Sequence, residues 1–389
     1  MSNAFKAIIA GGGFGGLTAA TALAQRGWSV TVYERQHELR ASGSGIYIWE
    51  NGLRILDAIG AQVVSRDSFH GRAMEQRDRN NQVIDPGDFP PSVRLVTVAR
   101  KDLLNGLRDA ALRAGVEIRT GAEVIGAGAA GDLHFAGARS AQADLAIGAD
   151  GVWSAVRRAL GLELFHQQTD EGALRAIIPG TQEDLGFDGQ GKYIELWSGS
   201  RRLLITPLNR HEIYLAFTCQ KDDLAGKASP LDKAAWIASF PHWAHLIERV
   251  DTLLPWAPYS IVKVKAWSAG RTALIGDAAH AQPPNLGQGG GMAMQSGLAL
   301  ATFLEDLEDR RDIPERLQAW EAHERELAEH CQRWSCLYGE VSVLPDDARS
   351  RIIHHGMADP WVRSQILRAA QSQPTGTQRP GQPVRLAAN

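Results

Sequence analysis

Hydrophobic and polar positions at the start of the chain alternate in a way that predicts β-α-β. Residues 6–10 form a short apolar run, residues 17–26 are rich in Ala and Leu at helical spacing, and residues 29–33 alternate with β-branched side chains. A second helix-then-strand step is predicted over residues 101–114 and 116–119, where Leu positions share one helical stripe and Gly115 marks the helix end.

The middle of the chain has a different pattern. Residues 193–197, 202–206 and 212–217 read as short strands separated by turn residues, which predicts an antiparallel sheet inserted into the first unit. Residues 272–275 return as a buried strand, a loop rich in Gly and Pro follows, and helical spacing resumes at residues 292–307. The first unit is therefore expected to be discontinuous in sequence.

These patterns divide the chain into four parts. A charged amphipathic helix is predicted over residues 314–340, with Leu317, Trp320, Leu327, Cys331, Trp334 and Leu337 on one side. The expected parts are a nucleotide-binding domain (1–70, 98–165 and 266–312), a substrate domain (71–97 and 166–265), a helical region (313–371) and a loose tail (372–389) rich in Pro, Gly, Gln and Ser.

Composition narrows the class of protein. The 389 residues carry a net charge of −3 with 44% hydrophobic positions, which is typical of a globular protein and argues against a nucleic-acid partner. No apolar run approaches the roughly 18–20 residues of a membrane helix. Three cysteines cannot build a disulfide framework, so a cytoplasmic location is expected. His242 and His245 lack a third ligand, as does the pair at residues 354–355, and no metal site is predicted.

The strongest motif is a glycine fingerprint between the first strand and the first helix. Gly11, Gly13 and Gly16 match G-x-G-x-x-G, in which the glycines allow a tight turn, close approach to a pyrophosphate and close helix–strand packing. Glu34 ends the second strand, where a carboxylate can accept hydrogen bonds from a ribose diol. The combination predicts an adenine dinucleotide at the helix N-terminus.

A second match to the same pattern has the wrong context. Gly126, Gly128 and Gly131 also satisfy the spacing, but residues 132–136 alternate like a strand and do not open a helix. We therefore interpret this match as a glycine-rich hairpin turn, which leaves one dinucleotide fingerprint in the chain.

Two later segments favour FAD over NAD. Asp150-Gly151 follows a strand, and either Asp150 or Ser154 can cap the short helix that comes next. Gly276-Asp277 ends the buried strand, and the loop of residues 283–291 opens a helix, so that a carboxylate and backbone N–H groups can meet a ribityl chain and a flavin edge.

The fingerprint and these two segments, in this order, resemble the single-component (group A) flavoprotein aromatic monooxygenases of the para-hydroxybenzoate hydroxylase fold. The resemblance covers residues 5–340 and implies an α/β fold, α+β overall, with a discontinuous Rossmann-type FAD domain, an inserted mostly antiparallel substrate sheet and C-terminal helices. It implies that Glu34 holds the adenosine ribose, Arg100 reaches the pyrophosphate, Asp277 binds the ribityl chain and Arg40 lies near the FAD. The residues so placed beside FAD are Gly11, Gly13, Phe14, Gly15, Gly16, Glu34, Arg35, Arg40, Arg100, Asp150, Asp277, Gly287, Gly289 and Gly290.

A finer likeness points to one branch of this family. Residues 45–54, 202–207 and 212–215 are similar to hydroxypyridine monooxygenases of the 2-methyl-3-hydroxypyridine-5-carboxylate oxygenase type. That likeness implies substrate contacts for Arg202 and Tyr214 and a place near flavin and substrate for Tyr47. The flavin-facing loop departs from that branch at residues 282–283 and 287–292, and Pro283 of this loop is also predicted as a catalytic-site residue. From the residues alone, Arg202 can equally pair with Glu195 or face solvent, Tyr214 and Tyr47 can be packing residues, and His280 can be a proton relay or a structural histidine.

The family resemblance implies a reaction. FAD is reduced by NADH or NADPH and reacts with O2 to a flavin C4a-hydroperoxide, which hydroxylates a small electron-rich ring in aromatic catabolism. A hydroxypyridine or pyridine carboxylate is the preferred substrate, and a hydroxybenzoate or salicylate is the alternative. A flavin dehydrogenase or reductase on the same fold, and a non-catalytic flavin-bound sensor using Trp320 and Trp334 as a partner surface, are the competing functions. A monomer or homodimer is expected.

Overall fold

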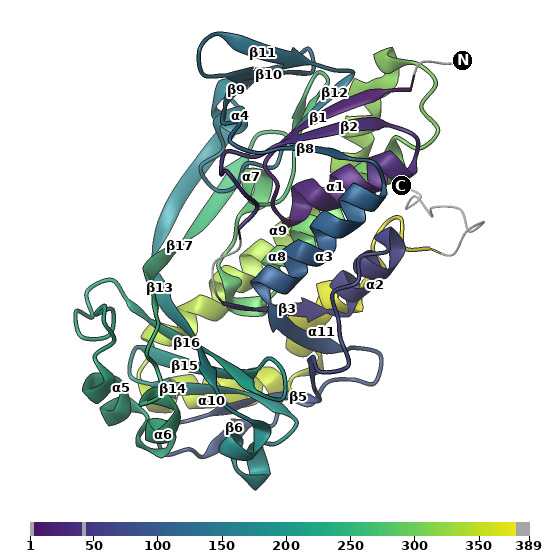
Figure 1. The fold of residues 1–389 in the computed structure, drawn as a ribbon. Helices are drawn as coiled ribbons and strands as arrows, with labels where there is room; N and C mark the ends of the chain where they lie inside the picture. The colour runs from purple at the N-terminus through teal and green to yellow at the C-terminus, as the bar shows by residue number, and fades with distance from the viewer. Residues whose placement is uncertain (1–3, 41–43, 379–389) are drawn as a thin grey trace.

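The computed structural model describes residues 4–40 and 44–378, and its N-terminal unit is the predicted β-α-β (Figure 1). Strand β1 (Lys6–Ala10) leads into α1 (Phe14–Gln25), and β2 (Ser29–Tyr33) returns beside β1 in parallel. The helix forms because its Ala and Leu positions are nearly all buried, from Leu17 to Leu23.

The first sheet collects strands from distant parts of the chain. Its order is β18-β19-β12-β1-β2-β8, in which β1 pairs in parallel with both β2 and β12. The remaining members are β8 (Glu117–Arg119), β12 (Leu145–Gly148), β18 (Ser268–Ala269) and β19 (Thr272–Leu274). Because β19 pairs with β12, residues beyond 270 complete a sheet that begins at residue 6, and the predicted discontinuity is confirmed.

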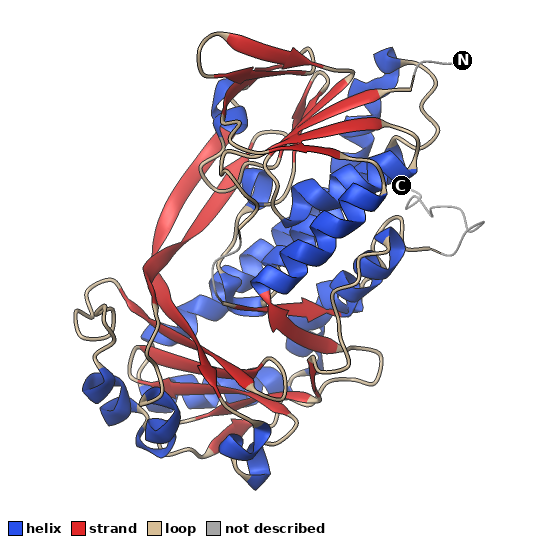
Figure 2. Ribbon diagram, viewed as in Figure 1, coloured by secondary structure: helices blue, strands red, loops and turns tan. Residues whose placement is uncertain are grey.

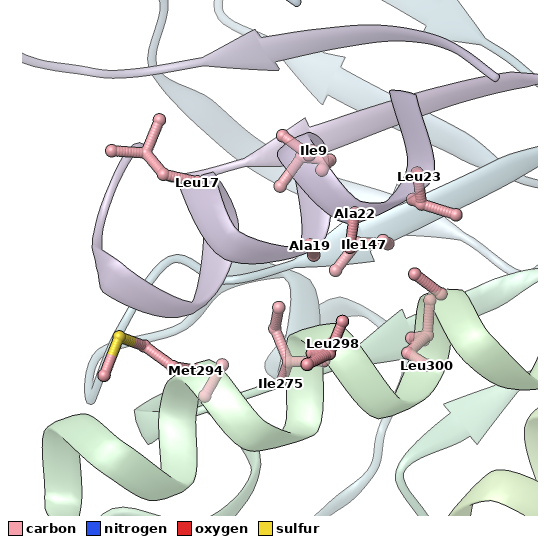
Figure 3. Close-up of a cluster of buried hydrophobic side chains, with 14 of the residues drawn as sticks. Ile9, Leu17, Ala19, Ala22, Leu23, Ile147, Ile275, Met294, Leu298 and Leu300 are labelled. Atoms are coloured by element: carbon pink, nitrogen blue, oxygen red, sulfur yellow. The ribbon is translucent and has the colours of Figure 1, made fainter. Parts of the chain in front are cut away.

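Helices pack on this sheet through close backbone contacts. Helix α1 lies against α3 (Arg100–Arg113) and α8 (Gly289–Phe303), with α9 (Ile313–Glu340) beyond. Ile9 and Ile147 from the sheet, Leu17 and Leu23 from α1, and Leu298 from α8 meet in the core (Figure 3). At the α1–α8 crossing Gly297 is required, because a Cβ there would stand 2.8 Å from the carbonyl oxygen of Gly15.

The second glycine match lies in a hairpin, as predicted. Strands β9 (Val124–Gly128), β10 (Asp132–Phe135) and β11 (Arg139–Gln142) form a small antiparallel sheet, and Gly131 occupies the turn with φ of +81°. No helix follows the turn, so this segment lacks the N–H cradle that a pyrophosphate needs.

A seven-stranded sheet forms the lower part of the molecule (Figure 2). Its order is β17-β13-β16-β15-β14-β5-β6, and all neighbours are antiparallel except β14 and β5. The members are β5 (Ala73–Arg77), β6 (Val83–Asp85), β13 (Glu163–Pro179), β14 (Lys192–Ser198), β15 (Arg201–Pro207), β16 (Glu212–Gln220) and β17 (Leu254–Val264). Strands β13 and β17 run side by side from the upper sheet to this lower one (Figure 1).

Smaller elements close the space between the two sheets. Strands β3 (Gly45–Trp49), β7 (Leu95–Ala99) and β4 (Phe69–Gly71) form a three-stranded sheet, and α2 (Glu50–Ile59) follows β3. The other α-helices are α4 (Ala155–Ala159), α5 (Lys233–Ser239), α6 (Ala244–Ile247), α7 (Asp277–His280), α10 (Asp346–Ala358) and α11 (Pro360–Gln371). The 3-10 turns are η1 (Gln182–Leu185), η2 (Phe187–Gly189), η3 (Pro241–Trp243), η4 (Pro284–Leu286), η5 (Arg310–Asp312) and η6 (Val341–Val343).

The C-terminal region differs from its prediction at two places. In α9, Trp320 is buried against Trp267, but Leu337, predicted on the same stripe, is 57% exposed. The loose tail predicted from residue 372 is wrong for residues 372–378, because the buried Thr375 donates a hydrogen bond of 2.6 Å to Glu324 of α9. Residues 379–389 lie outside the described residues.

Candidate active site

A cavity of about 610 Å³ lies where the two sheets, the β3 strand and the C-terminal helices meet. One half is lined by the fingerprint loop, Glu34, Arg100, Asp277 and the start of α8. The other half is lined by inward side chains of β13 to β16, by η4, and by residues of α9, α10 and α11. Its volume is within the usual range for a ligand site, and its lining comes from segments far apart in the sequence.

Backbone crowding explains the fingerprint glycines. Gly11 has φ of +103°, and a Cβ there would stand 2.3 Å from the carbonyl oxygen of Ala149, while a Cβ on Gly16 would stand 2.1 Å from the carbonyl oxygen of Gly11. At Gly13, by contrast, a Cβ meets nothing within 4 Å. Glu34 accepts a hydrogen bond of 2.9 Å from the Gly12 N–H, which fixes its carboxylate at the end of β2. This space at the start of α1 fits a pyrophosphate and a ribose diol.

Two opposite charges line the same half of the cavity, with Arg100 half-buried and Asp277 exposed to the cavity. Arg100 opens α3 with its guanidinium 5.1 Å from the Phe14 ring, and its Nε has no protein partner. Burial lowers the pKa of Arg100 and raises that of Asp277, and each charge partly offsets the shift of the other. The Asp277 carboxylate points into the cavity. A diphosphate beside Arg100 and ribityl hydroxyls beside Asp277 would satisfy both groups, so these residues fit FAD.

Several other residues predicted beside the cofactor also line this half. They include Phe14, Gly15, Gly287, Gly289 and Gly290, of which the last two begin α8 and present its free N–H groups to the cavity. Arg40 lines the rim, where it pairs with Glu38. Residues 41–43, between Arg40 and β3, lie outside the described residues.

Four predicted site residues do not reach the cavity. Gly11 lies against the backbone of Ala149, and Arg35 is exposed at the surface. Asp150 caps α4 by accepting hydrogen bonds from the N–H groups of Ala155 and Val156, and the predicted cap Ser154 also accepts one, from Arg157. Pro283 is buried with its carbonyl oxygen bonded to the Ser335 hydroxyl, and its neighbour Pro284 faces the cavity instead.

Two of the predicted substrate residues stand at the junction of the two halves. The hydroxyl of Tyr47 contacts the hydroxyl of Thr206, and its ring packs edge-on against Tyr193 with centroids 5.3 Å apart. Burial raises the pKa of Tyr47 well above its usual value. Tyr214 lies against Gly45, where a Cβ would stand 2.7 Å from the tyrosine ring, so the β3 strand must begin with glycine to admit it.

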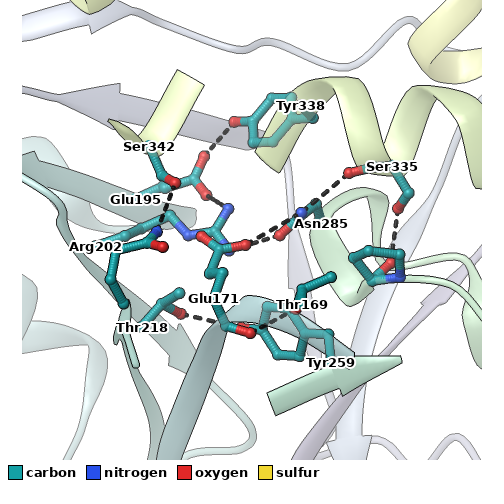
Figure 4. A network of polar contacts seen from close by, with 12 residues as sticks. Thr169, Glu171, Glu195, Arg202, Thr218, Tyr259, Asn285, Ser335, Tyr338 and Ser342 are labelled. Atoms are coloured by element: carbon teal, nitrogen blue, oxygen red, sulfur yellow. Dashed lines mark hydrogen bonds and ion pairs between the residues drawn. The ribbon is translucent and has the colours of Figure 1, made fainter. Parts of the chain in front are cut away.

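Arg202 belongs to a buried ionic network as well as to the cavity wall (Figure 4). It is 5% exposed, with Nη1 3.3 Å from Glu195 and Nη2 3.6 Å from Glu171. Nη2 also donates a 2.6 Å hydrogen bond to the amide oxygen of Asn285, and the Tyr338 hydroxyl donates to Glu195. Of the sequence interpretations, pairing with Glu195 is therefore confirmed, and exposure to solvent is wrong.

Several polar side chains in the second half were missed as site residues from the sequence, among them four ionisable ones. Arg175, Glu195, Tyr259 and Tyr338 all line the cavity, and Arg175 has no carboxylate within 4 Å among the described residues. Arg175 shares the inward face of β13 with Ala173. Because alternate residues of a strand face the same side, the alternation along β13 would have placed Arg175 in the cavity.

His280, a possible proton relay in the sequence, does not line the cavity. It is buried with its ring 5.1 Å from the Trp267 ring, and burial lowers its pKa to about 4. An unfolded histidine binds a proton below about pH 6.5, so protons favour unfolding between pH 6.5 and 4.

We therefore expect the free energy of unfolding to fall by roughly 3 kcal/mol as the pH drops through this window. Urea titrations at several pH values measure it, and His280→Gln is expected to flatten the profile. The matched His355→Gln, at an exposed position of α10, is expected to leave the slope unchanged, and an equal slope in all three proteins would contradict the assignment.

The comparisons with known proteins agree with this geometry. A family described as the FAD binding domain matches residues 4–335, and the chain belongs to it, as a single-component FAD monooxygenase of the para-hydroxybenzoate hydroxylase type. It is an aromatic-ring monooxygenase that uses FAD, NAD(P)H and O2, rather than a reductase or a sensor.

Three relatives cover nearly its whole length. The chain is 40% identical over 373 residues to a putative 2-heptyl-3-hydroxy-4(1H)-quinolone synthase of Rhodococcus erythropolis, covering 95% of this chain and 97% of the relative. It is 38% identical to the 2-heptyl-3-hydroxy-4(1H)-quinolone synthase of Mycobacteroides abscessus, with coverages of 89% and 93%. The solved tetrameric form of 2-methyl-3-hydroxypyridine-5-carboxylic acid oxygenase superposes with a TM-score of 0.85 at 32% identity, covering 96% and 98% of the two chains.

Membrane-spanning helices and metal clusters are both absent from the described residues. No helix there is both long and apolar enough to cross a membrane. No cluster of three or more His, Cys, Asp or Glu side chains is arranged to hold a metal ion in that same part of the chain.

Proposed function

We propose that this monooxygenase hydroxylates the ring of an N-heteroaromatic compound that carries an apolar substituent, with 2-heptyl-4(1H)-quinolone as the first candidate. The observation that carries the proposal is the apolar outer wall of the cavity. Trp49, Met74 and Phe89 line one side of it, and three residues of the C-terminal helices complete it: Met357, Ile366 and Leu367. Such a wall suits an alkyl chain, at roughly 0.8 kcal/mol for each buried CH2 group.

The polar groups deeper in the second half suit an N-heterocyclic ring. Arg175 offers donors to a ring carbonyl, and Glu195 offers an acceptor to a ring N–H. Arg202 already has two carboxylate partners, so it is not free to neutralise a carboxylate on the substrate. The names of the relatives from Rhodococcus erythropolis and Mycobacteroides abscessus support the same ring: hydroxylation that places an oxygen at C3 starts from the 4(1H)-quinolone without it.

Arg175 also favours a second candidate. Because its guanidinium has no carboxylate within 4 Å in the described part of the chain, it can bind the carboxylate of a hydroxypyridine carboxylate, the substrate class that the sequence favours. The likeness to 2-methyl-3-hydroxypyridine-5-carboxylic acid oxygenase supports this alternative.

The roles of the chain's own residues follow from their positions. Bound FAD, reduced by NAD(P)H, supplies the activated oxygen. The residues around Tyr47 and Tyr214 hold the ring at the junction of the two halves, and the apolar wall excludes water from it. Arg175 binds the ring carbonyl and Glu195 binds the ring N–H, so the two side chains together fix the orientation of the ring.

The test is a substrate panel on the purified, FAD-loaded enzyme. It includes 2-heptyl-4(1H)-quinolone, 2-methyl-4(1H)-quinolone, a hydroxypyridine carboxylate and a hydroxybenzoate, with NAD(P)H oxidation, O2 uptake and product mass as readouts. Stimulation by the heptyl compound, with one atom of oxygen gained from O2, supports the proposal. Stimulation only by the pyridine carboxylate supports the second candidate and overturns the first.

Narrowing the apolar wall is expected to select against long substituents. Ile366→Trp on α11 should raise KM for the heptyl quinolone about tenfold, because it displaces about two CH2 groups from buried contact, and should leave KM for the methyl quinolone unchanged. Ser364→Trp adds the same side chain at an exposed position of the same helix and is the matched control. Equal KM changes for both quinolones would show that the chain does not lie against α11.

A further inference from the structure

We propose that Glu195 is a catalytic residue, the acceptor of the substrate's ring N–H proton during hydroxylation. This inference rests on the proposed function, because it takes an N–H heterocycle as the substrate. It gives one carboxylate of the buried network a role in proton transfer, in addition to its ion pair with Arg202.

The position of Glu195 singles it out among the acidic groups of the cavity. Four carboxylates line it in the described part of the chain. Glu34 is bonded to the fingerprint loop, Asp277 faces Arg100, and Asp88 is exposed at the outer rim. Glu195, 6% exposed on β14, is the one carboxylate among these four that is bonded to Arg202 and Tyr338 in the second half.

The partners of Glu195 fix the direction of its carboxylate. Arg202 donates to Oε1 at 3.3 Å and the Tyr338 hydroxyl donates to Oε2 (Figure 4). Each carboxylate oxygen has a second lone pair, so both can accept one further hydrogen bond. Because Glu195 itself lines the cavity, a ring N–H entering the second half meets an acceptor there.

The surroundings also make Glu195 a stronger base than an exposed glutamate. Burial raises its pKa, and the Glu171 carboxylate on the other side of Arg202 raises it further. The Arg202 cation and the Tyr338 hydrogen bond oppose these effects and keep the carboxylate available as an acceptor. Three tyrosines of the same half, Tyr47, Tyr259 and Tyr338, have their own pKa values raised by burial and stay neutral.

The chemistry needs such an acceptor. In a 4(1H)-quinolone the N1 lone pair is conjugated to C3, so loss of the N1 proton raises the electron density at the carbon that is attacked. As the C2=C3 electron pair forms the C3–O bond, the N1 electron pair becomes the C2=N1 bond and the N1 proton passes to Glu195. When the C3 hydrogen leaves as a proton to solvent, N1 regains its proton from Glu195. One oxygen atom of O2 enters the ring, and the other leaves as water with the two electrons that NAD(P)H supplies, both being co-substrates of the monooxygenase.

The test compares two carboxylates and two substrates. Glu195→Gln is expected to lower kcat/KM for 2-heptyl-4(1H)-quinolone at least a hundredfold and to change kcat/KM for its 1-methyl derivative, which has no N–H, less than threefold. Glu171→Gln is the matched control, because Glu171 pairs with the same Arg202 but does not line the cavity. We expect it to reduce both values by the same factor.

A binding measurement on the oxidised enzyme gives a readout without turnover. The near-ultraviolet band of the bound N–H quinolone should be displaced from that of the free compound in wild type and Glu171→Gln and not in Glu195→Gln. FAD content and circular dichroism verify that each variant is folded. If Glu195→Gln does not fold, Glu195→Asp takes its place, because it keeps the charge on a side chain one CH2 group shorter. It should lower kcat/KM for the N–H substrate less than a hundredfold and leave kcat/KM for the 1-methyl derivative unchanged.

The outcomes separate the two proposals. Turnover of the N–H quinolone by wild type, with equal losses on both substrates in Glu195→Gln, overturns the role of Glu195 alone and makes it a structural residue. If the wild-type enzyme neither turns over nor binds the N–H quinolone, the proposed function is overturned, and this inference with it.

Discussion

Replacement of Arg202 by methionine is expected to lower the free energy of unfolding by about 3–5 kcal/mol. The reason is that Arg202 is the shared partner of Glu171 and Glu195, and all three side chains are less than a tenth exposed. Methionine fills similar volume but leaves two buried carboxylates without their cation. Urea unfolding followed by tryptophan fluorescence measures the loss.

Two further variants show whether charge is the cause. In the triple variant that also carries Glu171→Gln and Glu195→Gln, no ion is left unpaired, and we expect most of the lost stability to return. Lys221→Met removes an exposed pair with Asp170 and should change stability little. If the triple variant is no more stable than Arg202→Met, lost packing against the Trp197 ring, 5.1 Å away, is the cause instead.

Gly16→Ala is the second change with a large expected effect. Its Cβ would stand 2.1 Å from the carbonyl oxygen of Gly11 and 3.2 Å from the Cβ of Ala149, so α1 must move away from the sheet. We expect a loss of about 3 kcal/mol in stability and a purified protein with less than a tenth of the FAD of wild type. Flavin absorbance per protein and urea unfolding check the two effects separately.

Gly13→Ala is the matched comparison within the same loop. Gly13 has φ of −81°, which alanine adopts without strain, and its Cβ would meet nothing within 4 Å. We expect the protein without FAD to keep wild-type stability while the methyl group weakens FAD binding by occupying the space left for the pyrophosphate. Equal stability losses in the two alanine variants would contradict the role of the α1–sheet contact at Gly16.

The local parts of this fold could be predicted from the sequence. Periodicity and turn residues located β1, β2, β14, β15 and α9 to within one residue at each end, because each of these elements is determined by its own pattern of buried positions. Helix α1 and strand β16 were also located, with one end of each displaced by three residues. The fingerprint glycines were equally predictable, since their spacing reflects backbone crowding inside one loop.

Contacts between distant segments could not be predicted in this way. The pairing of Arg202 with Glu171 depends on β13 and β15 flanking the same strand, β16, and that of Arg202 with Asn285 depends on where η4 docks. Pro284, and not the predicted Pro283, lines the cavity because of the orientation of the 3-10 turn η4, which begins at Pro284. Residues 372–378 are ordered by the buried Glu324, which their own polar composition does not reveal.

The order of strands in the upper sheet has a consequence for synthesis of the protein. Strand β19, which pairs with β12, ends at Leu274, and α8, which covers α1, ends at Phe303. The N-terminal 270 residues therefore leave the ribosome without the strand and helix that complete their own domain. Such non-local pairing slows folding and exposes apolar edges to aggregation. We expect the nascent chain to need protection by chaperones until roughly four-fifths of it has been made, and FAD to join only after that point.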